Sequence, residues 1–172
     1  MTLEFTLDPP VTDELRKSVV DLWVDVSNAG GAVGFVGTVG ADVVGPVADA
    51  TFAGMAAGLD RLLIAIEDGE LVGLLFVISN RFGLKDHWRV LKRVMVRPGR
   101  QGRGYGAALM RAAADVGRDM GLDGLQVTVR GGLGTERFYA GLGYQEVGRI
   151  PGALRIAPGD DRDEILMWLA LR

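Results

Sequence analysis

Two nearly continuous apolar segments around an Asp-Gly turn place the strongest constraint on the fold. They are Arg61–Glu67 and Leu71–Ser79, within RLLIAIEDGELVGLLFVIS, and Asp68-Gly69 between them is typical of a tight hairpin turn. A strand with one face in water alternates apolar and polar residues, and these two strands do not. We therefore expect helices to cover both faces of the sheet that contains them.

Helical and extended patterns follow one another along residues 1–172, without a linker or repeat, so we expect a single domain. Thr12 precedes apolar residues at helical spacing and is typical of a helix N-cap. The glycine-rich segment 28–46 predicts a mobile loop before a helix at about Val47–Leu59. Strands are also expected at Leu3–Leu7, His87–Val96, Gly124–Val129, Tyr144–Ile150 and Glu164–Leu171, and helices at Gly104–Met120 and Thr135–Gly143.

Composition removes several kinds of chemistry. The 172 residues contain no cysteine and one histidine, which excludes thiolate catalysis and argues against a metal site, so we expect no metal. The N-terminus lacks the pattern of a signal peptide, and no apolar run is long enough to cross a bilayer. We therefore expect a cytoplasmic protein that does not act at a membrane.

Three glycines stand at the start of the helix expected at Gly104–Met120. In RPGRQGRGYGAA, the absence of side chains at Gly102, Gly104 and Gly106 would let a pyrophosphate reach the unpaired N–H groups of the helix, and we expect these glycines to allow positive φ. Ala107-Ala108 after the last glycine excludes a P-loop. The spacing also differs from the dinucleotide-binding G-x-G-x-x-G turn.

Positive charge gathers beside this turn in an otherwise acidic chain. The formal net charge is -3, yet residues 80–105 hold eight Lys or Arg against one Asp. Nucleic-acid-binding domains are usually basic overall, so this run favours a small anionic ligand and no nucleic acid. We expect Arg97, Arg100 and Arg103 to complement the charge of a phosphate.

Two motifs, in order, resemble the signatures of the GNAT superfamily of N-acetyltransferases. After the strand Val94–Val96, the stretch QGRGYG at residues 101–106 resembles the Q/R-x-x-G-x-G/A acyl-CoA motif. About thirty residues on, FYAGLGY at Phe138–Tyr144 resembles the second signature, a helix ending F-Y-x-x-L-G-F/Y. The resemblance covers nearly the whole chain and implies an α/β (α+β) fold, with a mixed, mostly antiparallel sheet of about six or seven strands and helices on both faces.

The resemblance also implies a coenzyme and a proton donor. Acetyl-CoA would be the acyl donor, its pyrophosphate held by backbone amides and its pantetheine paired with a strand where two strands separate. Tyr139 stands where many members keep a tyrosine that protonates the leaving thiolate, and a phenol with a pKa of about 10 suits that role. The residues assigned to the coenzyme are Val94, Met95, Val96, Gln101, Gly102, Arg103, Gly104, Tyr105, Gly106 and Ala107.

The expected reaction is direct attack of a neutral amine on the thioester carbonyl, with the N–H of Met95 or Val96 stabilising the oxyanion. Many members carry a carboxylate on the strand that enters the acyl-CoA motif, but WRVLKRVMV contains none. The residue that removes the proton of the amine is therefore left open, and the candidates are Glu67, Asp86, His87 and Glu136.

The acceptor is expected to be a small molecule such as an antibiotic, a toxin or a metabolite. GGAVGFVG at Gly30–Gly37 and the later GRIPGALR resemble the branch that includes tabtoxin-resistance acetyltransferases, and Arg130 with Lys92 would favour an acceptor carrying a carboxylate or phosphate. Two alternatives stay open: a protein acetyltransferase acting on lysine or an N-terminus, and a non-catalytic acyl-CoA sensor. A homodimer is expected from the resemblance alone.

Overall fold

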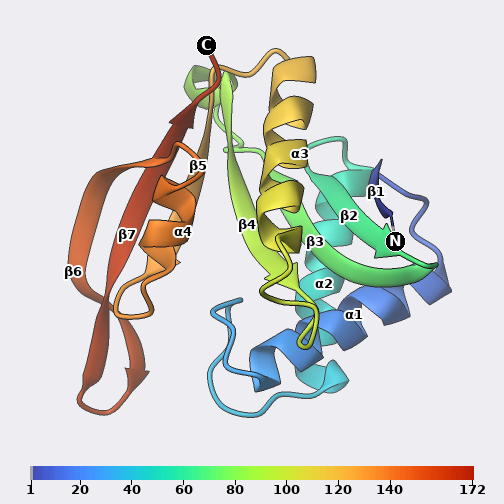
Figure 1. The fold of residues 1–172 in the computed structure, drawn as a ribbon, viewed down its shortest axis with the longest axis horizontal. Coiled ribbons are helices and arrows are strands. Elements are labelled where there is room, and N and C mark those ends of the chain that lie inside the picture. The colour runs from blue at the N-terminus through green and yellow to red at the C-terminus, as the bar shows by residue number, and fades with distance from the viewer. Residues whose placement is uncertain (1) are drawn as a thin grey trace.

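A mixed seven-stranded sheet is the framework of the protein, whose computed structural model describes residues 2–172 (Figure 1). The strands lie in the order β1-β2-β3-β4-β5-β7-β6, and every neighbouring pair is antiparallel except β4 and β5. The mixed, mostly antiparallel sheet that the resemblance implies is therefore confirmed. The strands are β1 (Leu3–Leu7), β2 (Arg61–Glu67), β3 (Glu70–Ile78), β4 (Trp88–Val96), β5 (Gly124–Arg130), β6 (Gln145–Ala157) and β7 (Asp160–Ala170).

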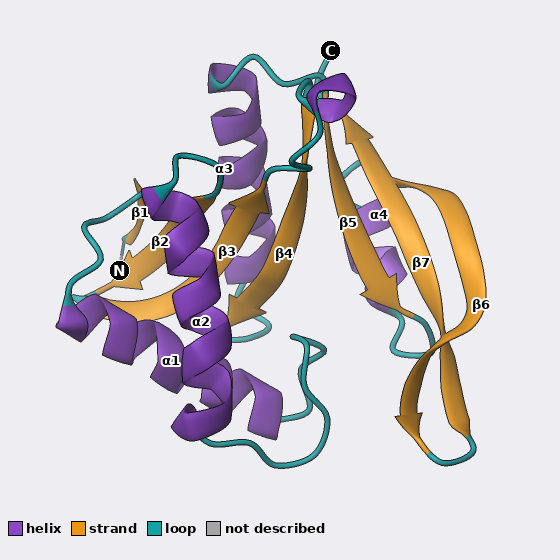
Figure 2. Cartoon of the chain, turned by 180° about the vertical axis from the view of Figure 1, so that it is seen from behind, coloured by secondary structure: helices purple, strands orange, loops and turns teal. Residues whose placement is uncertain are grey.

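Helices cover both faces of the sheet, as the continuous apolar strands predict. α1 and α2 lie on one face, and α3 and α4 lie on the other (Figures 1 and 2). None of the described helices is long and apolar enough to cross a membrane. The helices are α1 (Asp13–Asn28), α2 (Ala41–Ala56), α3 (Tyr105–Asp119) and α4 (Thr135–Ala140), with a 3₁₀ helix at Gly83–Lys85.

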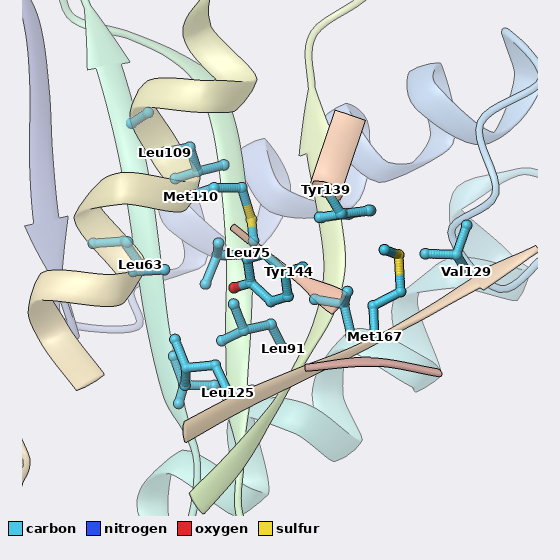
Figure 3. Close-up of a cluster of buried hydrophobic side chains, with 14 of the residues drawn as sticks. Leu63, Leu75, Leu91, Leu109, Met110, Leu125, Val129, Tyr139, Tyr144 and Met167 are labelled. Carbon is cyan, nitrogen blue, oxygen red and sulfur yellow. The ribbon is translucent and has the colours of Figure 1, made fainter. Parts of the chain in front are cut away.

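Each face of the sheet has its own apolar cluster. On one face, Leu109 and Met110 of α3 pack against the cluster that includes Leu75 of β3 (Figure 3). On the other face, Trp23 of α1 packs with Leu74, the neighbour of Leu75 along the same strand. Successive residues of a strand point to opposite faces, so both leucines are fully buried. This two-sided burial explains why the strand shows no polar alternation.

The local signals near the N-terminus and in the hairpin are confirmed. β2 and β3 pair across Asp68 and Gly69, which adopt φ values of 50° and 80°, the left-handed conformation that a tight hairpin turn needs. At α1 the Thr12 hydroxyl accepts a hydrogen bond of 3.1 Å from the N–H of Leu15. Short-range patterns therefore set these two features without help from the rest of the fold.

The second helix begins earlier than the sequence predicts. The glycine-rich segment predicts a loop to residue 46, but α2 starts at Ala41 and contains Pro46. A proline inside a helix removes one backbone hydrogen bond, whereas Val44 and Ala48 on either side are fully buried, and their burial stabilises the helix. The loop between α1 and α2 is consequently shortened to residues 29–40.

The last two strands are longer than the sequence predicts. The strands predicted at Tyr144–Ile150 and Glu164–Leu171 leave a long connection between them, whereas β6 continues to Ala157 and β7 begins at Asp160. Polar pairs extend this hairpin, because Arg155 contacts Asp161 at 2.7 Å and Arg149 contacts Asp163 at 3.1 Å. Such solvent-facing charged pairs give no apolar pattern from which a strand can be predicted.

The two central strands, β4 and β5, are joined at one end only. Trp88–Leu91 pairs in parallel with Gly124–Val127, and beyond this point the described strands show no pairing between β4 and β5 (Figure 2). Just past the last pair, the register of β4 with β3 shifts and Arg93 takes φ 56°, which marks a β-bulge. The open end of this strand pair is where the residues of the two motifs meet.

Candidate active site

One edge of β4 is left without a strand partner where β4 and β5 separate. Val96 and Met95 pair on their other edge with Gly73 and Leu74 of β3. Toward β5, no described strand pairs with the residues from Lys92 onward. Unpaired backbone groups of a strand can hydrogen-bond an extended ligand, as in strand addition. This is the position predicted for the pantetheine, although its assignment to Val94, Met95 and Val96 stays a prediction.

The unpaired edge of β4 leads into the glycine-rich turn, residues 97–104, and then into α3. Gly102 and Gly104 adopt φ values of 77° and 81°, so the positive φ expected at these two positions is found. The N-cap Gly104 offers no side-chain cap, and the first intrahelical bond runs from Ala108 back to it. The N–H groups of residues 105–107 are therefore free of partners in the described chain, and an anion can bind to them.

Gly106, unlike Gly102 and Gly104, does not adopt positive φ. This residue is the second of α3, and glycine is favoured there by packing. A Cβ at this position would lie 3.3 Å from the ring of Phe138 on α4. Gly106 therefore lets the two motifs approach each other, because α4 carries the second motif.

Two of the three arginines expected to complement phosphate are engaged in ion pairs within the protein. Arg97 contacts Glu70 at 3.1 Å and also reaches Asp25, and Arg100 pairs with Glu67 and Glu70. These carboxylates offset the charge of both arginines, and their predicted contact with a phosphate stays a prediction. No ion pair of Arg103 is found within the described residues, so it keeps its charge available beside the turn.

Glu67 anchors the glycine-rich turn to the β2–β3 hairpin. Its side chain is 1% exposed, and it accepts hydrogen bonds from the Arg100 guanidinium and from the Tyr105 hydroxyl. The bond to Glu67 raises the pKa of Tyr105. Because Tyr105 is the first residue of α3, this carboxylate fixes the helix start against the sheet.

Tyr139 lies on α4 with its ring buried and faces the space between the separated strands. Its ring packs edge to face on Phe138 and Tyr144, with centroid distances of 5.1 and 5.6 Å. Tyr139 and Tyr144 are both labelled in Figure 3. Burial raises the pKa of Tyr139 to about 12, so its phenol stays protonated at neutral pH. Tyr139 lines the same cavity as Val94 of β4, where a proton donor can reach a ligand held along that strand.

A cavity of about 300 Å³ occupies the open end of the strand pair. Its walls come from β4, β5, α4, the α1–α2 loop and the β6–β7 hairpin, so segments distant in the sequence meet there. Its charged residues are Lys92, Arg93, Arg130 and Glu164. The remaining lining residues are Ala32, Gly34, Val90, Leu91, Val94, Val127, Thr128, Tyr139 and Leu154.

None of the four candidate proton acceptors, three carboxylates and one imidazole, lines this cavity. Glu67 is buried beneath the glycine-rich turn instead, and Asp86, His87 and Glu136 are also absent from the walls. Glu164, at the start of the apolar part of β7, is the carboxylate among the described residues that does line it. No sequence motif marks this residue, because the pairing of β7 with β5 brings it to the site.

Residues 48–144 match the family model described as the Acetyltransferase (GNAT) family, and the match covers more than half of the chain. The chain belongs to this family. The description names a family of acetyltransferases, in agreement with the enzyme class predicted from the sequence, an acyltransferase. The match includes both motifs, the one after β4 and the one on α4.

A relative and two solved structures agree with this assignment. The chain is 33% identical over 127 residues to a mycothiol acetyltransferase of Nocardiopsis dassonvillei. The aligned part is 72% of this chain and 34% of that protein. The chain thus spans about a third of the length of that relative. The Salmonella typhimurium protein yncA, with its cofactor acetyl-CoA, is 18% identical with a TM-score of 0.78 over 100% of this chain and 95% of that chain. An aminoglycoside 6'-N-acetyltransferase complexed with coenzyme A is 16% identical with a TM-score of 0.75 over 100% and 98% of the chains.

The two ends of α3 offer a matched test of the glycine-rich turn. Gly104 at the start and Gly121 just past the end both have positive φ and open space around them. An alanine should strain the backbone similarly at either position. We expect Gly104→Ala to weaken acetyl-CoA binding about tenfold, whereas Gly121→Ala should leave it unchanged. Calorimetry measures both, and equal affinities of the two variants would contradict the role of the turn.

Titration of the three tyrosines tests the environment of Tyr139. Burial raises the pKa values of Tyr139 and Tyr144, and the bond to Glu67 raises that of Tyr105. The folded protein should therefore form little tyrosinate near pH 10, where tyrosines of a urea-unfolded chain are about half ionised. Since the unfolded chain then releases more protons, stability should fall as the pH rises from about 10 toward 12. Ultraviolet absorbance measures tyrosinate, and identical titration of folded and unfolded protein would contradict this account.

Proposed function

We propose that this GNAT protein transfers the acetyl group of acetyl-CoA to the amine of a small molecule in a ternary complex. The observation that carries the proposal is the continuity of three features: the unpaired edge of β4, the free amides of α3, and the protonated Tyr139 in the adjoining cavity. Together they can bind an extended phosphorylated thioester and supply a proton at its reactive end.

The amine attacks the thioester carbon, and the C–S bond breaks as the amide forms. We assign the removal of the proton of the amine to Glu164, because it is the carboxylate in the described walls of the cavity. The unpaired N–H groups of β4 would stabilise the oxyanion, and the Tyr139 hydroxyl would protonate the departing thiolate. Each proton thus has a named donor and acceptor.

The shape of the cavity favours a small acceptor over a peptide. Ala32 and Gly34 of the α1–α2 loop and Leu154 of the β6–β7 hairpin form part of the wall around a volume of about 300 Å³. This volume is at the small end of ligand pockets, whereas a peptide needs an extended groove. The small volume of the cavity supports a small-molecule amine as the substrate of the proposed reaction.

The proposed reaction is tested with Tyr139→Phe, using Tyr144→Phe as the matched control. The two rings pack against each other, but Tyr144 does not line the cavity, and its buried hydroxyl has no partner among the described residues. We expect Tyr139→Phe to lower kcat about a hundredfold with little change in acetyl-CoA affinity, because a general acid contributes about that much. Tyr144→Phe should keep its activity.

Release of coenzyme A thiol during incubation with acetyl-CoA and a panel of amines measures the turnover. Acetylation of peptides with no small amine accepted would favour a protein acetyltransferase. Binding of acetyl-CoA without turnover of any amine or peptide would favour a sensor. Full activity of Tyr139→Phe at saturating substrate would remove the tyrosine from the mechanism.

A further inference from the structure

Arg93 is a half-buried cation to which the described protein offers no counter-charge. Its guanidinium makes no hydrogen bond and no ion pair with any residue from 2 to 172. Burial alone lowers the pKa of Arg93, and no neighbouring carboxylate opposes this effect. Charged side chains are rarely buried without a partner, since removing the charge from water is costly.

The fold holds Arg93 in this position at some cost. Its φ of 56° places a residue other than glycine in the left-handed region, at the bulge of β4. Its guanidinium lies 5.7 Å from the centre of the Trp23 ring, a cation–π contact with the core of α1. On the other side it lies against Gly34, where any Cβ would collide with the guanidinium. Helix, loop and strand thus leave room for this cation and direct it to the cavity.

The surroundings of Arg93 add positive charge. The bulge brings the adjacent residue Lys92 into the walls of the same cavity. Arg130 lies there too, and its buried Nε has no hydrogen-bond partner in the described chain. Glu164 pairs in register with Arg130 across β5 and β7 and offsets one of these three cations. The cavity therefore keeps an excess of positive charge.

The coenzyme phosphates do not account for this excess. The glycine-rich turn that would bind them begins after the end of β4, and none of its residues lines the cavity that contains Arg93. The cavity is instead the space to which the proposed function assigns the acceptor. The acceptor is therefore the ligand of the proposed reaction that can bring an anion to Arg93.

We propose that Arg93 binds an anionic group of the acceptor, which makes the substrate an amine that also carries a carboxylate or a phosphate. This inference rests on the proposed function, because it concerns the acceptor of the same reaction. A guanidinium can bind either anion through two parallel hydrogen bonds. Its position beneath the α1–α2 loop would hold the acceptor by its anion while the amine faces the thioester.

Stability of the protein without substrate gives the first test, with Arg81 as the matched control. Arg81 also has positive φ, at 53°, but pairs at 2.6 Å with Asp60, whose side chain is 3% exposed. Arg93→Met should raise Tm by about 2 °C or more, because it removes an unpaired charge and keeps an apolar stem against Trp23. Arg81→Met should lower Tm. A fall in Tm for Arg93→Met as large as that for Arg81→Met would overturn the proposal, since Arg93 would then be structural.

Amines offered in matched pairs give the second test. The pairs are glycine with glycinamide, for the carboxylate, and phosphoethanolamine with ethanolamine, for the phosphate. The wild-type protein should prefer the anionic member of at least one pair by about tenfold or more in kcat/KM, and Arg93→Met should lose that preference. Arg93→Lys should recover part of it. Equal use of both members by the wild-type protein, or a preference that survives in Arg93→Met, would overturn the proposal.

A third arm separates failure of this inference from failure of the proposed function. With coenzyme A at saturation, so that the glycine-rich turn is occupied, inorganic phosphate should raise the Tm of the wild-type protein more than that of Arg93→Met. This result would support an anion site at Arg93 even if none of the amines is acetylated. Equal stabilisation of both proteins would overturn the anion site whether or not acetylation is observed.

Discussion

The site depends on the short length over which β4 and β5 pair in parallel. These strands hold together over Trp88–Leu91 and then separate, while β4 stays attached to β3 and β5 to β7. The separation leaves an unpaired strand edge that ends at the glycine-rich turn. It also opens the cavity into which Tyr139 and Glu164 project from elements far apart in the sequence. Closing this gap would remove the predicted coenzyme site and the acceptor cavity together.

The distribution of ion pairs decides which of the many arginines can act on a ligand. The sequence shows a basic run, but Arg97 and Arg100 are neutralised by carboxylates of the β2–β3 hairpin and α1. Their contribution is to hold the glycine-rich turn in place. Arg93 and Arg130 have no ion pair within the described part of the chain, so their charge is directed to the cavity. Charge counted along a sequence is therefore a poor guide to charge available at a site.

Local patterns predicted much of this fold, and long-range pairing produced the rest. The Asp68-Gly69 turn and the Thr12 cap depend on a few neighbouring residues, so the sequence was sufficient for them. The start of α2 was missed because burial of Val44 outweighs its glycines and Pro46. Glu164 and Arg93 were missed as site residues for a similar reason. The position of Glu164 depends on the register of β7 with β5, and that of Arg93 depends on a bulge that no local sequence motif predicts.

The most direct measurement is calorimetric titration of the purified protein with acetyl-CoA, with dephospho-CoA and NADH as controls. The unpaired strand and the helix amides predict one acetyl-CoA bound per chain and no binding of NADH. The uncompensated charge of Arg103 predicts weaker binding of dephospho-CoA, which lacks the 3′-phosphate. Absence of acetyl-CoA binding by the folded protein would contradict the account. Equal binding of NADH would also contradict it, because the site would then recognise a pyrophosphate and not the thioester arm of the coenzyme.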